Sequence, residues 1–238
     1  MARARKWFAA ALLAPVAAVA MLVANPPDRP RADDADVDVA LVLAIDCSYS
    51  VDASEHRLQM EGFGAALQSP EVWKAIRSGA HRRIAVTVFQ WSDVSNQRII
   101  IPWTVIDTED KAIRLGGILA QGGRIVPQGG TGISAAMMFG YSLLGDGPRA
   151  TRQVIDIATD GRNNMGTPTP QTRDAIVAQG VTINALAILN EWPTLDKYLE
   201  RQVAGGDENF VEKATTYDDF GAAMLRKLVK EITGPGMT

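Results

Sequence analysis

The sequence Leu41-Val-Leu-Ala-Ile-Asp-Cys-Ser-Tyr-Ser50 continues an apolar run that begins at Val39, and it ends in oxygen-bearing side chains. An apolar run of this length between polar residues is typical of a strand buried on both faces of a sheet. At its carboxyl end, Asp46, Ser48 and Ser50 alternate, and alternation along a tight loop can bring all three to one side. Hard cations such as Mg²⁺ take oxygen ligands of this kind. The fragment alone fits a metal site, and it fits an Asx turn followed by a helix cap equally well.

Two later stretches carry the same kinds of side chain. Gly129-Gly-Thr-Gly132 precedes a helix-like segment, and Ile157-Ala-Thr-Asp-Gly161 ends a second apolar strand. Together with the first stretch, they resemble the metal-ion-dependent adhesion site (MIDAS) of von Willebrand factor type A (vWA) domains. The resemblance extends over residues 37–232 and is greatest to the exported, single-domain bacterial members. It implies five metal ligands, in the family's order: Asp46, Ser48, Ser50, Thr131 and Asp160.

The resemblance also implies what the site binds. The expected ion is Mg²⁺, with Mn²⁺ or Ca²⁺ as alternatives, and an Asp or Glu of a protein partner would complete its coordination shell. The charges agree with this, because two carboxylates balance one divalent cation and leave a centre that does not repel an acidic group. Tyr49 occupies a position that the motif leaves free, and it is bulkier than the small residue often found there.

The order of apolar and amphipathic segments predicts an α/β fold. Strands and helices should alternate into a doubly wound, mostly parallel central sheet with helices on both faces, a Rossmann-like arrangement. The short connection at 92–96 predicts a hairpin, hence one antiparallel edge strand. Expected strands are Val39–Ile45, Arg83–Trp91, Gln97–Val105, Gln153–Thr159, Val181–Leu189 and Asn209–Lys213. Expected helices open at the capping box Asp52-Ala-Ser-Glu55 and after Thr131, and span Pro70–Ser78, Thr108 to about Gln121, Thr169–Gln179, Thr194–Ala204 and Thr216–Thr233.

In such sheets, ligands bind beyond the carboxyl ends of strands where the strand order reverses. Asp46 and Asp160 each end a predicted strand, and the topology of the resembling family places those two strands side by side. Fold and motif therefore predict the same place for the site.

The sequence also predicts how the chain divides into a leader, a linker, a domain and a tail. Residues 1–24 combine three basic residues with an apolar segment and small residues near its end, as in a secretory signal peptide, with an uncleaved N-terminal anchor as the alternative. Residues 25–36 resemble a solvated linker, 37–233 form the vWA-like domain, and 234–238 form a C-terminal tail. The expected location is periplasmic or secreted, or else anchored on the outer face of the cytoplasmic membrane.

Composition limits the partners. The formal net charge is −3, and loss of the three basic residues Arg3, Arg5 and Lys6 makes it −6. No Lys/Arg cluster follows them, so neither nucleic acid nor an anionic membrane surface is an expected partner, and the only predicted membrane contact is the possible anchor. We expect a monomer. The single cysteine, Cys47, excludes an internal disulfide and should be a small buried apolar residue.

An enzyme at this site is the main alternative. A metal-assisted hydrolase would need a base or an activated water near the ion. The two histidines, His56 and His81, are expected at the surface and away from this chemistry, and no second aspartate follows two residues after Asp46. Gly122 to Gly130 lacks the Lys-Ser/Thr ending of a phosphate-binding loop. A binding module is therefore favoured over an enzyme, and a structural domain with a vestigial metal site is the third possibility.

The loops around the predicted ion should determine which partner binds. Tyr49, Trp91 and Trp192 follow strands on that side and are candidate partner contacts, with loop packing as the alternative. Arg162 and Asn163, together with Asn164, are polar candidates. One charged residue is assigned to structure instead. Asp156 falls in mid-strand, where an unpaired charge would be unfavourable, so we expect it to bond to Asn184 or to a nearby arginine.

Overall fold

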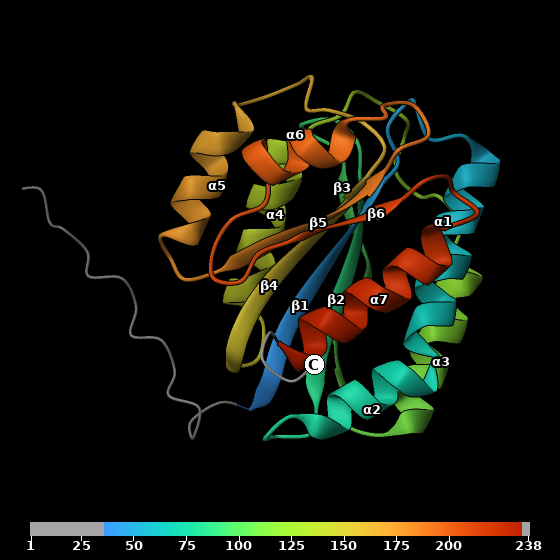
Figure 1. Ribbon diagram of the computed structural model, residues 1–238, viewed down its shortest axis with the longest axis vertical. Helices are drawn as coiled ribbons and strands as arrows, with labels where there is room; N and C mark the ends of the chain where they lie inside the picture. The colour runs from blue at the N-terminus through green and yellow to red at the C-terminus, as the bar shows by residue number, and fades with distance from the viewer. Residues whose placement is uncertain (1–35, 235–238) are drawn as a thin grey trace, which may run out of the picture.

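The computed structural model describes residues 36–234, in which helices cover both faces of one sheet (Figure 1). The predicted leader, all of the predicted linker except Asp36, and the last four residues lie outside this range. The strands are β1 (Val37–Asp46), β2 (Ile84–Trp91), β3 (Gln97–Ile106), β4 (Ala150–Thr159), β5 (Thr182–Ile188) and β6 (Val211–Ala214). The helices are α1 (Ala53–Leu67), α2 (Pro70–Ser78), α3 (Glu109–Ala120), α4 (Ile133–Gly145), α5 (Thr169–Val177), α6 (Leu195–Gln202) and α7 (Phe220–Thr233).

The sheet confirms the predicted fold class. Its strand order is β3-β2-β1-β4-β5-β6, and every pair is parallel except β2 with β3. From β1, the chain first builds outward to β2 and β3 and then returns to place β4 on the other side of β1. The strand order therefore reverses between β1 and β4, which are neighbours, as predicted.

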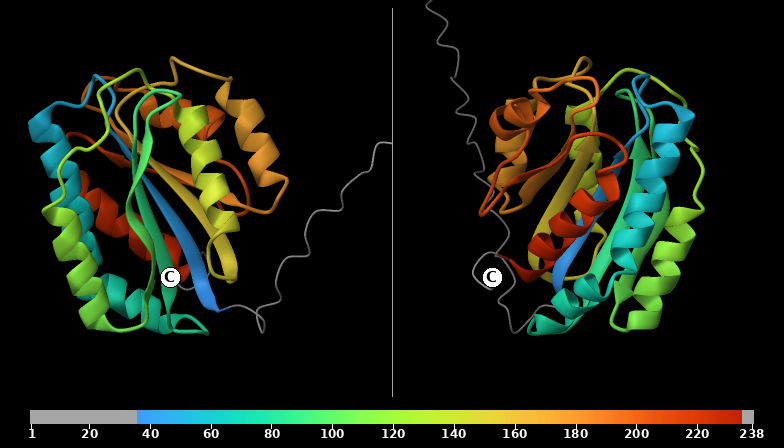
Figure 2. Two further views of the ribbon diagram at one scale, coloured as in Figure 1. Left: turned by 180° about the vertical axis from the view of Figure 1, so that it is seen from behind. Right: turned by 45° about the vertical axis from the view of Figure 1, so that its right-hand side comes forward.

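The central strand is buried on both faces because its side chains alternate between two cores. Leu41, Leu43 and Ile45 face the group formed by α1, α2, α3 and α7, while Val42 and Ala44 face α4, α5 and α6. Figure 2 shows these two helical layers on either side of the sheet. Both sets of side chains are fully buried, so the unbroken apolar run of the sequence follows from the two-sided burial of β1.

Local signals predicted the starts of α1 and α2 correctly. Asp52 caps α1, and its carboxylate accepts from the Glu55 amide while Glu55 accepts from the Asp52 amide, which is the predicted capping box. Helix α2 begins at Pro70, as predicted. In the described residues 36–234, no helix has the length and apolar character needed to cross a membrane.

The start of α7 is different from the prediction. The helix was expected to begin at Thr216, but it begins at Phe220 with Asp219 at the capping position. Thr216 and Tyr217 instead form turns, in which their carbonyls accept from the amides of Asp219 and Phe220 at 3.2 Å. Tyr217 is buried, and its place in the core holds these residues outside the helix.

Asp156 is structural, as predicted, but both predicted partners are wrong. Its carboxylate lies 2.9 Å from the ammonium of Lys227 on α7, which is also 2.5 Å from Glu231. Asn184 lies opposite Asp156 in the sheet register, yet its side-chain amide donates to Glu231 at 2.9 Å. We call Asp156, Lys227 and Glu231 the buried charge cluster, because all three are almost completely excluded from solvent.

Candidate metal centre

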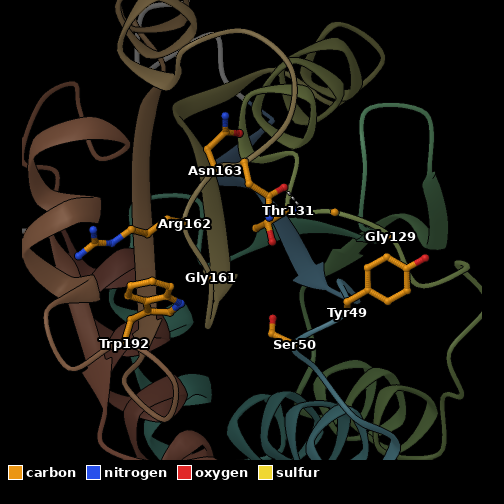
Figure 3. A pocket seen from close by; sticks show the side chains of 10 residues that line it. Tyr49, Ser50, Gly129, Thr131, Gly161, Arg162, Asn163 and Trp192 are labelled. Atoms are coloured by element: carbon orange, nitrogen blue, oxygen red, sulfur yellow. Dashed lines mark hydrogen bonds between the residues drawn. The ribbon is translucent and has the colours of Figure 1, made fainter.

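The structure brings the five predicted ligands to one end of the sheet. Asp46 is the last residue of β1, and Asp160 directly follows the neighbouring strand β4. Ser48 and Ser50 lie in the loop between β1 and α1, and Thr131 lies in the loop before α4. Figure 3 shows Ser50 and Thr131 facing the same hollow beside Gly161. The sequence motif is therefore a spatial cluster, assembled where the strand order reverses.

The cluster is held together by hydrogen bonds between its own members. The Ser48 and Ser50 hydroxyl oxygens are 3.2 Å apart, and the Ser50 hydroxyl donates to Asp160 Oδ1 at 2.6 Å. The Ser48 amide donates to Asp46 Oδ1 at 2.7 Å. Thr131 approaches from the other side, where a Cβ added to Gly161 would lie 3.1 Å from its hydroxyl oxygen. A glycine after Asp160 therefore leaves room for the threonine.

Residues outside the motif hold the remaining carboxylate oxygens. The Thr159 hydroxyl donates to Asp46 Oδ2 at 2.5 Å, and the Tyr217 hydroxyl donates to Asp160 Oδ2 at 2.9 Å. The Gln59 side chain donates to the Asp46 carbonyl at 3.2 Å. Sequence reasoning missed all three. Thr159 precedes Asp160 within the motif stretch and could have been considered, whereas Tyr217 lies 57 residues beyond Asp160 and carries no local signal.

The two carboxylates form an electrostatically unfavourable pair. Asp46 and Asp160 are both fully buried. Burial, and then the neighbouring Asp160, raise the pKa of Asp46 to about 7. Burial also raises the pKa of Asp160. Within residues 36–234, neither carboxylate has a lysine or arginine as an ion-pair partner.

This arrangement fits a hard divalent cation. The donor set consists of two carboxylates and three hydroxyls, all oxygen, which is the chemistry that Mg²⁺, Mn²⁺ and Ca²⁺ prefer. A cation would remove the repulsion between the two buried carboxylates, which no side chain of residues 36–234 offsets with a positive charge. The described residues contain no group of three His, Cys, Asp or Glu side chains suited to a metal, so hydroxyl ligands are essential to this candidate site.

The ligand loops are tied to one another by backbone contacts. The Tyr49 amide donates to the Gly129 carbonyl at 2.9 Å. The Arg124 guanidinium donates to the carbonyls of Cys47, Val51 and Asp52, at 3.3, 2.6 and 3.1 Å. One arginine thus joins the loop that carries the serines to the loop that precedes Thr131. Cys47 is buried, as predicted.

Two of the three predicted rim aromatics lie at the hollow, and the third does not. Tyr49 and Trp192 are 73% and 47% exposed, and both line the hollow at the site. Trp91 is fully buried, so its assignment to the rim is wrong. It is the last residue of β2 and shares the strand face of Phe89, which packs into the core beneath α4. Its side chain therefore points into the protein and not toward the end of the sheet.

The polar rim residues have structural partners. Arg162 stacks on Trp192 and on Tyr198, with its guanidinium carbon 4.9 and 5.5 Å from the ring centroids. The Asn163 side-chain oxygen accepts from the Ser134 amide at 3.2 Å. The Asn164 side-chain oxygen accepts from the Thr131 amide at 2.8 Å, so this asparagine positions a predicted ligand. The hollow itself has a volume of about 260 Å³ and is lined by Tyr49, Ser50, Gly129, Gly130, Thr131, Gly161, Arg162, Asn163, Asn164 and Trp192.

His56 is not at the surface, contrary to expectation. It is 4% exposed, and its Nε2 lies 3.2 Å from the side-chain nitrogen of Gln90, which also donates to the Gly123 carbonyl. Gln90 therefore links the histidine to the loop that leads to Thr131. Burial, and then Arg124, lower the pKa of His56 to about 4.

Comparison with known families identifies the chain. A family described as "Protein of unknown function (DUF1194)" matches residues 36–236, which is most of the sequence. The chain belongs to the DUF1194 family. No curated protein sequence matches this DUF1194 chain.

Solved structures show that the DUF1194 chain has the vWA fold. Proximal thread matrix protein 1 (PTMP1) from the mussel byssus, with a zinc-occupied MIDAS motif, has a TM-score of 0.61 at 18% identity over 84% of this chain and 49% of its own. The von Willebrand factor type A protein from Catenulispora acidiphila has a TM-score of 0.56 at 17% identity, covering 83% and 42%. The vWF domain of the type V pili tip protein Mfa5 from Porphyromonas gingivalis has a TM-score of 0.53 at 13% identity, covering 85% and 98%.

The DUF1194 chain spans about half the length of the PTMP1 structures that it matches. At identities this low, the similarity establishes the fold of the chain and not its activity.

Proposed function

We propose that this protein is a divalent-metal-dependent protein-binding module of the adhesion or assembly type, and not an enzyme. Asp46, Ser48, Ser50, Thr131 and Asp160 would hold Mg²⁺, with Mn²⁺ or Ca²⁺ as alternatives. The observation that carries the proposal is the pair of fully buried carboxylates that no cationic side chain in residues 36–234 offsets, with hydroxyl oxygens between them. When bound, the ion would supply a Lewis acid that can accept a carboxylate oxygen from a partner.

The charges of the site support binding to such a group. The two aspartates contribute two negative charges and the ion two positive charges, so the loaded centre is neutral. An Asp or Glu of the partner can then approach without net repulsion. The serine and threonine hydroxyls provide ligand oxygens without adding charge, which keeps this balance.

Hydrolysis at the same ion is less well supported. Such a reaction needs a base placed beside the attacking water. The imidazole of His56 is buried beside Gln90, and its lowered pKa makes it a weak base. In this proposal the carboxylates serve only to hold the ion.

The proposal includes the cellular location of the protein, outside the cytoplasmic membrane. The sequence of residues 1–24 favours export to the periplasm or beyond, or retention as an anchor. Structures that resemble the chain include a pilus adhesin, SpaC, and a pili tip protein, Mfa5. A role in protein contacts outside the cytoplasmic membrane is consistent with both observations.

The proposal is tested by metal-dependent capture. The immobilised protein is incubated with envelope extract in Mg²⁺ or in EDTA, and retained proteins are identified. We expect to retain proteins that elute with EDTA. Neither the Asp46→Ala nor the Asp160→Ala variant should capture them. Asp107→Ala, at an exposed aspartate paired with Lys111, is the matched control and should capture normally. Turnover of phosphate esters or peptides that requires both Mg²⁺ and Asp46 would contradict the assignment as a binding module.

A further inference from the structure

The surface around the hollow indicates which acidic segment fits. We propose that the partner presents a single acidic side chain flanked by apolar side chains, which pack on Tyr49 and Trp192. This inference rests on the proposed metal-dependent function, and it specifies the chemistry of the partner that the same site selects.

Two exposed aromatic side chains stand on opposite sides of the ligand cluster. Tyr49 comes from the β1–α1 loop and Trp192 from the β5–α6 loop, and Figure 3 shows Ser50 and Thr131 between them. Large apolar side chains that remain 73% and 47% exposed at a concave site are typical of interface anchors. An acidic side chain that enters the hollow would have its neighbours beside these two rings.

The apolar surface continues beyond the aromatic pair. Met165 is 41% exposed and packs directly on Gly130, which lines the hollow. Val94 is 44% exposed and lies 3.0 Å from where a Cβ on Gly166 would stand. These side chains extend the apolar surface on the side of the loop that carries Thr131. Flanking apolar groups of a partner would therefore find contacts on more than one side of the ion.

Arg162 is a positioning residue for Trp192. Its guanidinium stacks on the Trp192 and Tyr198 rings and donates to the Thr194 hydroxyl at 3.0 Å. Figure 3 shows this side chain extending away from Ser50 and Thr131. Its charge is therefore directed to the rings and not into the hollow. A second acidic group of the partner would not meet a free cation there.

Nearby carboxylates oppose a second acidic group as well. Glu55 accepts from the Asn190 side chain at 3.1 Å, so it is held beside the β5–α6 loop that carries Glu191. Glu55 lies in the first turn of the helix that follows the serine loop, and Glu191 directly precedes Trp192, which lines the hollow. These glutamates lie within electrostatic range of the ligand cluster. A partner segment rich in Asp and Glu would be repelled by them, whereas a single carboxylate is bound by the ion.

The size of the hollow agrees with one inserted side chain. Its volume of about 260 Å³ is below the roughly 300–1,000 Å³ of small-molecule sites. Gly129, Gly130 and Gly161 form part of its lining, and a Cβ at these positions would meet Asp93, Met165 and Thr131 respectively, so the protein presents backbone atoms there. The space therefore suits one Asp or Glu and the backbone next to it.

Selection from random peptides tests the inference. The purified protein is immobilised in Mg²⁺ and exposed to displayed random heptapeptides, and bound clones are eluted with EDTA. We expect enriched sequences with one Asp or Glu and with Leu, Ile, Val, Met or Phe within two residues of it. Magnesium-dependent clones with acidic runs or polar flanks would overturn the apolar-flank inference and leave the proposed function standing. Failure to recover any magnesium-dependent clone, together with no binding of Mg²⁺ in calorimetry, would overturn both.

Variants then locate the contact. The affinity of one enriched peptide, measured by fluorescence anisotropy, should fall about tenfold in Tyr49→Ala and in Trp192→Ala, with the affinity for Mg²⁺ unchanged. Trp73→Ala is the matched control, because Trp73 also stacks with an arginine, Arg77, but lies on α2. Unchanged peptide affinity in both rim variants would refute the contact.

A double-mutant cycle separates positioning from direct binding. Arg162→Gln should lower the affinity of the parent protein for the peptide. It should have no further effect when Trp192→Ala is already present, because the arginine acts through that ring. Equal effects of Arg162→Gln in both backgrounds would show that the arginine contacts the peptide itself.

Discussion

Replacing Lys227 with methionine removes the one positive charge of the buried charge cluster. The ammonium lies 2.9 Å from Asp156 and 2.5 Å from Glu231, and Lys227 and Asp156 are fully buried while Glu231 is 2% exposed. Its charge also faces the Phe210 ring, at 5.0 Å from the centroid. Methionine has a similar length and volume, so the substitution changes the charge with little effect on packing.

The expected loss in the free energy of unfolding follows from the two buried carboxylates that no longer have a positive partner. Burial, and then Glu231, already raise the pKa of Asp156 to about 7, with Lys227 present to lower it. Removing one partner of a buried ion pair typically lowers the free energy of unfolding by about 3–5 kcal/mol. For a domain of this size, such a loss lowers the melting temperature by roughly 6–20 °C.

Thermal and urea unfolding followed by circular dichroism measure the loss. Lys230→Met is the matched control, because Lys230 is an exposed lysine of the same helix. Adding Asp156→Asn to Lys227→Met should restore part of the stability, since one of the two uncompensated charges is removed. If Lys227→Met is no more damaging than Lys230→Met, the ion pairs do not hold α7 on the sheet.

The loss of stability in Lys227→Met should also depend on pH. A carboxyl group whose pKa is raised in the folded state stabilises the protein below its unfolded pKa, and this contribution is lost as pH rises through the folded value. Lys227 lowers the pKa of Asp156, so without the lysine this carboxyl should stay protonated to a higher pH. The deficit of Lys227→Met relative to the parent should therefore be larger at pH 8 than at pH 5. A deficit that is constant across this range would indicate a packing defect.

Three further predictions concern the ligand cluster. Mg²⁺ at a hundredfold excess over its Kd should stabilise the folded protein by about 2.7 kcal/mol and raise its melting temperature, whereas Asp46→Ala and Asp160→Ala should show equal melting in Mg²⁺ and EDTA. Because the raised pKa of Asp46 makes protons compete with the ion, calorimetry should find weaker Mg²⁺ binding at pH 5.5 than at pH 8, and an affinity independent of pH would contradict this. Tyr217→Phe leaves Asp160 Oδ2 without its donor and should lower stability in EDTA by about 1–3 kcal/mol, with the rise in melting temperature on adding Mg²⁺ retained.

The parallel sheet could be predicted because its strands have the simplest pattern. Apolar runs buried on both faces, such as Val39–Ile45, leave few alternatives, and turn residues mark where they end. The five candidate ligands were named through the resemblance to the vWA motif. Asp46 and Asp160 stand at the ends of two such strands, whereas Thr131 precedes α4. Their binding of a metal ion stays a prediction, which the Mg²⁺ measurements described above test.

The errors came from contacts between residues distant in the chain. Thr216 has a good capping side chain, but the bond between Tyr217 and Asp160 keeps this segment outside α7. Asp156 pairs with Lys227, which is 71 residues away and has no local feature that singles it out. Trp91 was a different kind of error. Its strand places it on the same face as Phe89, so alternation alone predicted that it faces the core.

Arg124 has a consequence for which ion the site would favour. By binding the carbonyls of Cys47, Val51 and Asp52, it fixes the serine-bearing loop. Ligands already ordered in this way lose little conformational entropy when an ion arrives. A fixed frame also resists expansion, and Ca²⁺ needs longer bonds and more ligands than Mg²⁺. Loosening the frame, as in Arg124→Met, should therefore shift the preference of the site toward the larger ion.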